Sequence, residues 1–369
     1  MISEDSIIKD FNKILLICFG GIGDVILFFP VIKTIRDLYP KSSIILVVEP
    51  RCKSIGESNP NVNKVITFDI KNKPSIPDYI DFIKKLRHEE LDLAISMGSI
   101  FLVPILLFLS KAEHRIGYAT NKLKFLYTKA VPLNKDQYAA KMYFDLLAGI
   151  GIDADRLDPV PQMDIPELEK EWAKNWFESK KLVSKGDSKI VILHPGVSKL
   201  SKIKNIVKNW EANKWTQLVN MLLDKNIKVV LVGGPDDEED VNFIKKHVKS
   251  LNKQNFISAY GETKSLSQFA ALVSLSDLLV CVDSAPMHIG VAINSPLVAI
   301  FGPTSDTKVL PPDDEKFKAV RIKLDCAPCL WDTRTTTCEA LTCIKGLGVE
   351  QVFKIIMDNL ETKTETKEG

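Results

Sequence analysis

Short apolar runs alternate with amphipathic stretches along most of this 369-residue chain. Apolar runs bounded by turn residues are typical of strands buried on both faces. Such runs predict strands at residues 13–19, 44–48, 65–68, 91–96, 190–193, 228–232, 256–258, 278–282 and 296–301. Helical periodicity predicts helices at 25–39, 80–87, 100–110, 139–147, 167–181, 215–225, 237–250, 265–274, 286–293 and 348–360. Strands that alternate with helices in this way indicate an α/β fold built on parallel sheets.

The alternation breaks once, at residues 153–166, where three prolines and several acids indicate a linker. A chain of this length also favours two domains. We therefore expect a Rossmann-like domain at 1–160, a second at 167–348, a closing helix at 349–360 and a disordered polar tail at 361–369. Both domains are expected to be doubly wound and to face a central cleft.

Composition is ordinary for a globular protein, with 45% hydrophobic and 26% charged residues. A formal net charge of +2 argues against a general nucleic-acid binder. The N-terminus does not resemble a signal peptide. The longest apolar run, residues 100–109, contains Pro104 and is too short to span a bilayer, so it predicts either a buried helix or a lipid-facing patch. A cytoplasmic protein is expected.

Two strand-to-helix turns carry the candidate chemistry. Residues 20–24 read Gly-Gly-Ile-Gly-Asp, and residues 283–288 read Asp-Ser-Ala-Pro-Met-His. In open α/β sheets, ligands bind at the carboxyl ends of the strands. The first turn offers the Asp24 carboxylate, and the second offers the N–H groups of Ser284 and Ala285 at a helix N-terminus, which suits a diphosphate. A base that faces a phosphate leaving group indicates group transfer.

Other interpretations of the first turn remain open. Gly21 and Gly23 match two glycines of a dinucleotide fingerprint, but Ile26 stands where the third is expected. Glu49 ends the second strand, as a ribose-binding acid would. An NAD-type oxidoreductase therefore remains an alternative, and Asp24 is equally explained as a helix cap.

A lysine-rich segment follows the strand that ends in His194-Pro195-Gly196. Its lysines precede the next acid, Glu211, and are Lys199, Lys202, Lys204 and Lys208. Such a run is either a solvated face or a loop that contacts phosphate.

The motifs, taken together, resemble glycosyltransferase family 9, the ADP-heptose:lipopolysaccharide heptosyltransferases. The similarity extends over about residues 12–358. It is carried by LLICFGGIGDVILFFPVIKTIRDLYP (15–40), VILHPGVS (191–198), VVLVGGPDD (229–237) and, most diagnostically, LLVCVDSAPMHIGVAINSPLVAIFGPT (278–304). The resemblance implies a GT-B fold, an acceptor-binding N-terminal domain, a C-terminal domain for the nucleotide sugar, and inversion at the anomeric carbon without a required cofactor.

The resemblance also implies residue roles. Asp24 is expected to be the general base, and Lys208 to neutralise the leaving diphosphate. The expected donor-binding residues are Gly196, Lys199, Lys202, Gly233, Asp283, Ser284, Ala285, Met287, His288 and Thr304. The expected acceptor-binding residues are Gly21, Gly23, Arg51, Arg115 and Lys122, where the basic side chains would meet an anionic glycan. Tyr138 departs from the family, which often has histidine there, so the acceptor is expected to differ from that of such relatives.

Four of the seven cysteines, Cys326, Cys329, Cys338 and Cys343, fall close together. This spacing predicts either a structural zinc or iron site or free, partly oxidised thiols.

The leading hypothesis is therefore transfer of heptose from ADP-heptose to a lipid-linked lipopolysaccharide core acceptor, with peripheral contact at the inner face of the cytoplasmic membrane. A heptosyltransferase acting on a protein, and a transferase using another nucleotide sugar, are the enzymatic alternatives. A non-catalytic nucleotide-binding protein and the oxidoreductase are alternatives of another class.

Overall fold

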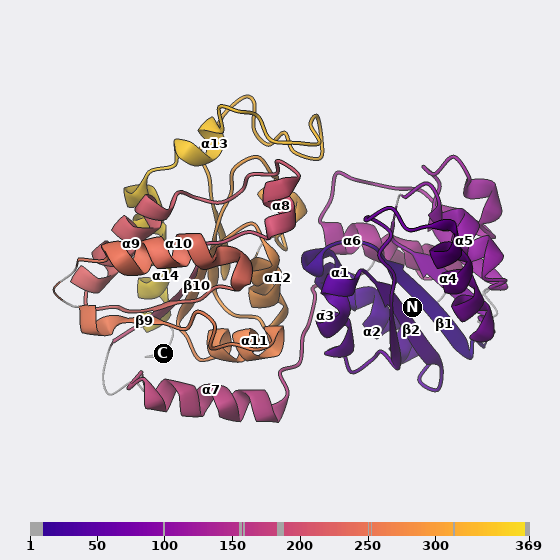
Figure 1. Ribbon diagram of the computed structural model, residues 1–369, viewed down its shortest axis with the longest axis horizontal. Helices are drawn as coiled ribbons and strands as arrows, with labels where there is room; N and C mark the ends of the chain where they lie inside the picture. The colour runs from indigo at the N-terminus through magenta and orange to yellow at the C-terminus, as the bar shows by residue number, and fades with distance from the viewer. Residues whose placement is uncertain are drawn as a thin grey trace. The chain divides into compact units, whose positions relative to one another are not determined.

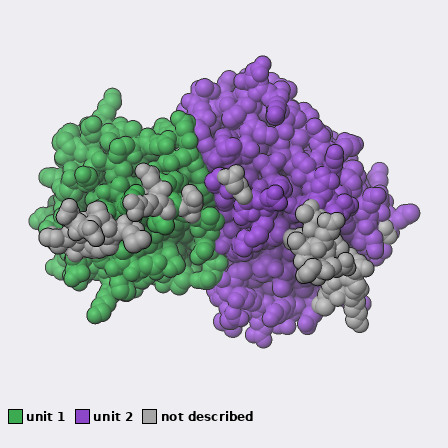
Figure 2. All heavy atoms as spheres, turned by 180° about the vertical axis from the view of Figure 1, so that it is seen from behind, with its two compact units in different colours: residues 1–164 green, residues 165–369 purple. Residues whose placement is uncertain are grey.

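The computed structural model describes residues 10–98, 100–154, 157, 159–182, 188–249, 251, 253–312 and 314–365. The chain divides into two compact units, Met1–Asp164 and Ile165–Gly369 (Figure 2). Each unit contains one parallel sheet of six strands with helices packed around it (Figure 1).

The first unit is built on a sheet with the strand order β3-β2-β1-β4-β5-β6. Its strands are β1 Lys13–Cys18, β2 Ser43–Val48, β3 Lys64–Thr67, β4 Leu93–Ser96, β5 His114–Tyr118 and β6 Lys129–Val131. Its helices are α1 Ile22–Leu27, α2 Phe29–Leu38, α3 Lys53–Glu57, α4 Ile76–His88, α5 Val103–Leu109 and α6 Ala139–Phe144, with 3₁₀ turns η1 Pro50–Cys52, η2 Lys124–Leu126 and η3 Asp145–Ile150.

The second unit is built on a sheet with the order β12-β11-β10-β7-β8-β9. Its strands are β7 Ile190–His194, β8 Lys228–Leu231, β9 Phe256–Ser258, β10 Leu278–Val282, β11 Leu297–Ile300 and β12 Phe317–Val320. Its helices are α7 Glu167–Ser179, α8 Lys199–Ile203, α9 Ala212–Asp224, α10 Glu238–His247, α11 Leu266–Ser274, α12 Ala285–Ala292, α13 Thr342–Lys345 and α14 Val349–Glu365. Its 3₁₀ turns are η5 Pro235–Asp237, η6 Lys253–Asn255 and η7 Asp306–Lys308.

The central strands are apolar because both of their faces are covered. Every residue of β10 is buried, and so is every residue of β1 after Lys13. In each unit the strand order is that of the dinucleotide-binding sheet. The strands are all parallel, but the order in which the chain adds them reverses between the first and fourth strands. Those reversal points lie between β1 and β4 and between β7 and β10, and ligands of such sheets bind outside the carboxyl ends of the strands there.

The prediction of two doubly wound α/β domains is confirmed by these two sheets. The expected helix at 25–39 is instead two helices, since α1 ends at Leu27 and α2 begins at Phe29 with Pro30 in its first turn. Strands β5, β6 and β12 were not predicted, because they are short or carry polar residues. The lysine-rich segment contains α8.

The polar tail differs from expectation over residues 361–365, which continue α14. Glutamate and lysine favour helix, and extending an existing helix costs little. Residues 366–369 lie outside the described residues. Among the helices that the structure describes, none combines the length and the apolar character needed to cross a membrane.

Candidate active site

The Asp24 carboxylate lies just beyond the carboxyl end of β1, in the first turn of α1. Its Oδ2 accepts a hydrogen bond from the Gly21 N–H at 2.7 Å, and its Oδ1 accepts one from the Tyr143 hydroxyl at 2.7 Å. A Cβ atom on Gly20 would lie 2.3 Å from the Asp24 Cβ, so glycine is needed for the close approach of this side chain to the turn. Asp24 is therefore a helix cap, and a second donor also fixes its orientation.

That second donor, Tyr143, was missed in the sequence analysis. It lies on α6, where its ring packs edge-on against Phe28 with centroids 6.2 Å apart. Burial, and then the nearby charge of Asp24, raises the pKa of Tyr143 well above its usual value, so the hydroxyl stays protonated and can donate. A tyrosine on an amphipathic helix resembles a core residue, and no local pattern links it to a carboxylate 119 positions earlier in the sequence.

Arg51 flanks the same turn. A Cβ atom on Gly21 would lie 3.6 Å from both Arg51 Nη2 and Asp24 Oδ2. Arg51 Nε donates to Glu49 Oε2 at 2.9 Å, and Lys71 forms an ion pair with Glu49 Oε1. Glu49 is only 4% exposed, so a buried carboxylate holds two cations near the ends of β2 and β3. Glu49, considered above as a ribose ligand, is occupied by these ion pairs.

Two other predicted acceptor residues lie elsewhere in the first unit. The Arg115 guanidinium donates to the backbone carbonyls of Leu126 at 2.9 Å and Ala112 at 2.6 Å, and it lies over the Phe108 ring. These contacts stabilise the segments around β5. Lys122 is exposed. No recorded contact within the described residues joins either cation to Asp24, whereas Gly23 lies in the first turn of α1.

In the second unit, the Asp283 carboxylate follows β10 directly. Its Oδ2 accepts hydrogen bonds from Lys208 Nζ at 3.0 Å and from the Thr304 hydroxyl at 2.6 Å. Burial alone would raise the pKa of Asp283, but Lys208, Thr304 and His288 together lower it below its usual value. The structure thus brings together four predicted donor-site residues, with Lys208 held at the turn by a buried charge.

Helix α12 begins at this turn. No side chain among the described residues caps it, because the Ser284 hydroxyl donates instead to the Val282 carbonyl at 3.3 Å. The backbone N–H groups of Ser284 and Ala285 are therefore not satisfied by a side-chain cap, as expected of an anion-binding helix terminus. Met287 is fully buried and supports the helix from within the core.

The two lysines of α8 contact acids in the neighbouring η5–α10 region. The backbone N–H of Lys199 donates to Asp236 Oδ2 at 2.7 Å, and Lys202 Nζ lies 3.6 Å from Asp240 Oδ2. Burial raises the pKa of Asp240, although Lys202 opposes this shift. These contacts fix α8 against α10.

The predicted glycines Gly196 and Gly233 adjoin Asp237, a buried residue that the sequence analysis did not single out. A Cβ atom on Gly196 would lie 1.6 Å from Asp237 Oδ1, and one on Gly233 would lie 3.1 Å from the Asp237 Cβ. Asp237 Oδ2 also lies 3.6 Å from His194 Nε2, and burial lowers the pKa of that histidine. In this structure the space left by Gly196 is filled by the Asp237 carboxylate.

The four clustered cysteines do not form the metal site that their spacing suggested. They are free thiols that range from exposed Cys326 to buried Cys343. Within the part of the chain that the structure describes, no three His, Cys, Asp or Glu side chains are grouped to hold a metal ion. Sequence spacing does not make sulfur atoms converge. The loop is instead fixed by backbone bonds from Cys329 and Leu330 to the Pro303 carbonyl.

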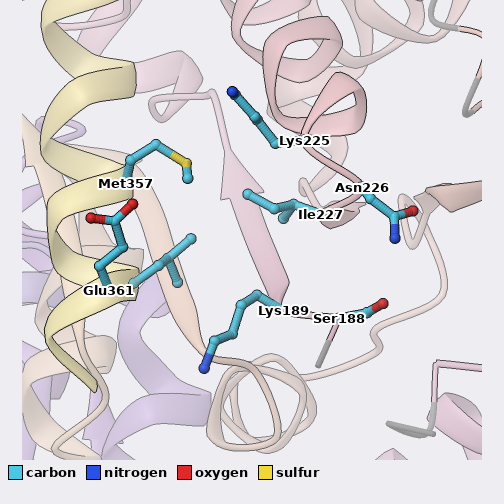
Figure 3. A pocket seen from close by; sticks show the side chains of 8 residues that line it. Ser188, Lys189, Lys225, Asn226, Ile227, Met357 and Glu361 are labelled. Carbon is cyan, nitrogen blue, oxygen red and sulfur yellow. The ribbon is translucent and has the colours of Figure 1, made fainter. Parts of the chain in front are cut away.

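A cavity of about 420 Å³ lies at the amino-terminal ends of strands β7 and β8 in the second unit (Figure 3). It is lined by residues that precede β7 and β8 and by the end of α14, namely Ser188, Lys189, Lys225, Asn226, Ile227, Met357, Leu360 and Glu361. Since ligands of parallel sheets bind at carboxyl ends, this position does not match a donor site.

Comparison with known proteins identifies the family of this chain. The family model for glycosyltransferase family 9 (heptosyltransferase) matches residues 79–339. Lipopolysaccharide heptosyltransferase 2 of Escherichia coli K12 is 25% identical over 318 residues, covering 84% of this chain and 88% of that protein. Lipooligosaccharide heptosyltransferase 2 of Campylobacter jejuni serotype O:6 is 26% identical over 337 residues, covering 91% and 95%.

Solved structures show the same fold. E. coli ADP-heptose lipopolysaccharide heptosyltransferase II superposes with a TM-score of 0.73 at 23% identity, covering 95% of this chain and 99% of that one. A family 9 glycosyltransferase from Veillonella parvula gives a TM-score of 0.76 at 22% identity, covering 97% and 99%. The family resemblance and the GT-B class are thereby confirmed. The chain belongs to glycosyltransferase family 9, the heptosyltransferases, and is a glycosyltransferase.

Proposed function

We propose that this enzyme transfers heptose from ADP-heptose to a lipopolysaccharide inner-core acceptor, with inversion at the anomeric carbon. The observation that carries the proposal is the pair of groups at the two turns. In the first unit the Asp24 carboxylate is held in a fixed orientation beyond β1. In the second unit Lys208 lies at the turn that begins α12, a helix without a side-chain cap. The curated relatives named above support the acceptor class. Structures of E. coli heptosyltransferase WaaC with ADP and with ADP-2-deoxy-2-fluoro heptose, similar in fold at TM-scores of 0.67 and 0.66, support the donor class.

The first unit is proposed to bind the acceptor, within the boundaries 1–160. Asp24 would take the proton from the acceptor hydroxyl. Gly21 and Tyr143 each donate to one carboxylate oxygen and hold the group in place, and each oxygen can still accept a second hydrogen bond. Arg51 lies beside the same turn and would attract an anionic glycan. Arg115 and Lys122 would not contact the acceptor directly but would attract it electrostatically over a longer distance.

The second unit is proposed to bind the donor, within the boundaries 167–348. The N–H groups at the start of α12 would contact the diphosphate, and Lys208 would neutralise charge that develops on it. Asp283 and Thr304 would position Lys208. Lys199 and Lys202 would add positive charge from α8. Gly196 and Gly233 leave room for Asp237, and the three residues would together form one wall of the donor site.

The proposed reaction is a single displacement. The acceptor oxygen forms a bond to the anomeric carbon as the bond from that carbon to the diphosphate oxygen breaks. The acceptor proton passes to Asp24, and ADP leaves with the electron pair of the broken bond. Attack opposite the leaving group inverts the configuration. Lysine and helix N–H groups supply the positive charge that stabilises the leaving group, so no cofactor is invoked.

Family membership decides against the oxidoreductase and the non-catalytic hypotheses. Acceptor identity and donor identity need a direct test, because the enzymatic alternatives share the fold and the base. The partners we propose are a nucleotide sugar and a lipid-linked anionic glycan, with no role for nucleic acid. The proposed location is the cytoplasm, at the inner face of the cytoplasmic membrane.

The test is a donor and acceptor panel with product detection by mass spectrometry. Purified enzyme is incubated with ADP-heptose, UDP-glucose or GDP-mannose, and with either a heptose-deficient lipopolysaccharide core or an unmodified protein acceptor. Heptose added to the lipopolysaccharide core only from ADP-heptose is expected. Transfer to the protein alone, or from UDP- or GDP-sugar alone, would overturn the proposed substrates while leaving the fold and the base unaffected.

A further inference from the structure

Large apolar side chains are exposed at one region of the first unit. Phe101 is 54% exposed, Phe108 51%, Phe125 74% and Leu102 36%. The opposite side of α5 is buried, with Val103 fully covered in the core. The helix therefore anchors an aromatic face, defined as Phe101, Leu102, Phe108 and Phe125.

Three contacts show that this face is continuous. The Asn121 side chain donates to the Ile100 carbonyl at 3.2 Å, which joins the start of α5 to the turn that leads into η2. The Arg115 guanidinium lies 5.6 Å from the centre of the Phe108 ring. The same guanidinium donates to the carbonyl of Leu126, the residue after Phe125, at 2.9 Å. Helix α5 and η2 thus pack together, and their exposed rings belong to one surface region.

The charge around this face is strongly one-sided. Residues 100–129 contain five lysines and arginines but a single acid, Glu113. Lys111, Lys124 and Lys129 are exposed, and none of the three forms a recorded ion pair with a described carboxylate. Exposed rings set among unpaired cations are typical of proteins that bind at a membrane interface, where the rings enter the headgroup region and the cations meet anionic lipid.

We propose that the aromatic face docks the protein reversibly onto an anionic lipid bilayer, with Phe101 and Phe125 inserted at the headgroup level. A second copy of the chain fits the charge less well. A two-fold interface through this face would place its lysines opposite one another, and like charges across an interface oppose association. The docking surface lies on the first unit and deepens the membrane location given under the proposed function, on which it rests, but it does not depend on which sugar the enzyme transfers.

Vesicle sedimentation tests the proposal without turnover. Wild-type protein is mixed with vesicles of phosphatidylcholine alone or with 30% phosphatidylglycerol, and the bound fraction is measured at low and high salt. Binding is expected to anionic vesicles and to weaken with salt. The double variant Phe101→Ser/Phe125→Ser is expected to lose at least tenfold in partition coefficient, because each ring contributes buried apolar area. Phe108 is left unchanged because its ring supports Arg115.

Two further variants complete the design. Lys111→Gln/Lys124→Gln/Lys129→Gln should lose roughly 100-fold on anionic vesicles, since each cation near such a surface contributes about one factor of five. The matched control Leu168→Ser/Leu251→Ser removes side chains that are 80% and 97% exposed in the second unit, and it should bind as wild type does. Circular dichroism checks that each variant is folded.

The outcomes separate cleanly. Wild-type protein that does not sediment with anionic vesicles would overturn the proposal, and so would a folded Phe101→Ser/Phe125→Ser variant that binds as wild type does. Loss of a wild-type dimer in that variant, measured by sedimentation velocity and with vesicle binding unchanged, would assign the face to a second copy instead. Failure of heptosyl transfer with vesicle binding intact would count against the proposed function alone.

Discussion

Replacing Tyr143 with phenylalanine removes only the hydroxyl that donates to Asp24 Oδ1 at 2.7 Å. The ring and its edge-on contact with Phe28 are retained. A hydrogen bond to a charged group contributes about 1.5–3 kcal/mol. If that bond holds the carboxylate in its reactive orientation, its loss should reduce kcat roughly 10- to 100-fold, because each 1.4 kcal/mol of barrier is about one factor of ten.

The effect of Tyr143→Phe on kcat and KM separately distinguishes positioning from a merely structural role. The KM for the nucleotide sugar should stay near the wild-type value. Tyr127→Phe is the matched control, since the Tyr127 hydroxyl is also buried but has no hydrogen-bond partner in the described structure.

The assay measures initial rates of ADP release over a range of donor concentrations, with saturating acceptor, for wild type and both variants. A Tyr143→Phe enzyme with kcat within twofold of wild type would refute the positioning role. An equal loss in Tyr127→Phe would show that the assay reports general damage to the first unit.

The second unit yields three further predictions. Lys208→Met should weaken ADP binding about tenfold or more in calorimetry, whereas Lys208→Arg keeps the charge and should bind better than the methionine variant. The pKa of Asp283 is lowered in the folded protein, so its contribution to stability is present above the unfolded carboxyl pKa of about 3.9 and is lost as pH falls through the lower folded value. Thermal melts below pH 4 should therefore fall less steeply for Asp283→Asn than for wild type, and equal slopes would contradict this. Gly196→Ala would place a Cβ atom 1.6 Å from Asp237 Oδ1 and should destabilise the fold by about 1–3 kcal/mol, while Gly234→Ala, with 3.9 Å of clearance, should not.

The sequence was sufficient to predict the fold and the two turns because both depend on local signals. Strands β1 and β10 are apolar throughout their buried length, and glycine or proline marks the start of the helix after each. Some strands at or near the edges of the sheets lack that signal. β12 reads Phe-Lys-Ala-Val and is only partly buried, so it was not recognised.

Contacts between residues far apart in sequence were not predictable from a local pattern. Tyr143 and Asp237 gain their places at the turns only when α6 and η5 pack against strands formed elsewhere in the chain. In the described residues the four cysteines are not grouped as metal ligands, for the same physical reason. Spacing along the chain brings four thiols into one loop, but it does not set the distances or directions of their sulfur atoms.

Two candidate residues are held by contacts within the protein. Arg115 was expected to contact the acceptor, yet three backbone carbonyls, those of Leu126, Ala112 and Glu113, accept its hydrogen bonds. Lys208 is likewise held by Asp283 in this structure. A lysine held in this way is preorganised, because the protein has already fixed its position before the diphosphate binds.

The central claim is that Asp24 activates the acceptor in a heptosyl transfer. The most direct measurement compares wild type and Asp24→Asn with ADP-heptose and a heptose-deficient lipopolysaccharide core, and follows the mass of the acceptor together with ADP affinity. The account predicts one added heptose with wild type, and a loss of turnover of about 100-fold or more in Asp24→Asn with ADP affinity unchanged. Near wild-type turnover in Asp24→Asn would contradict the assignment of the base.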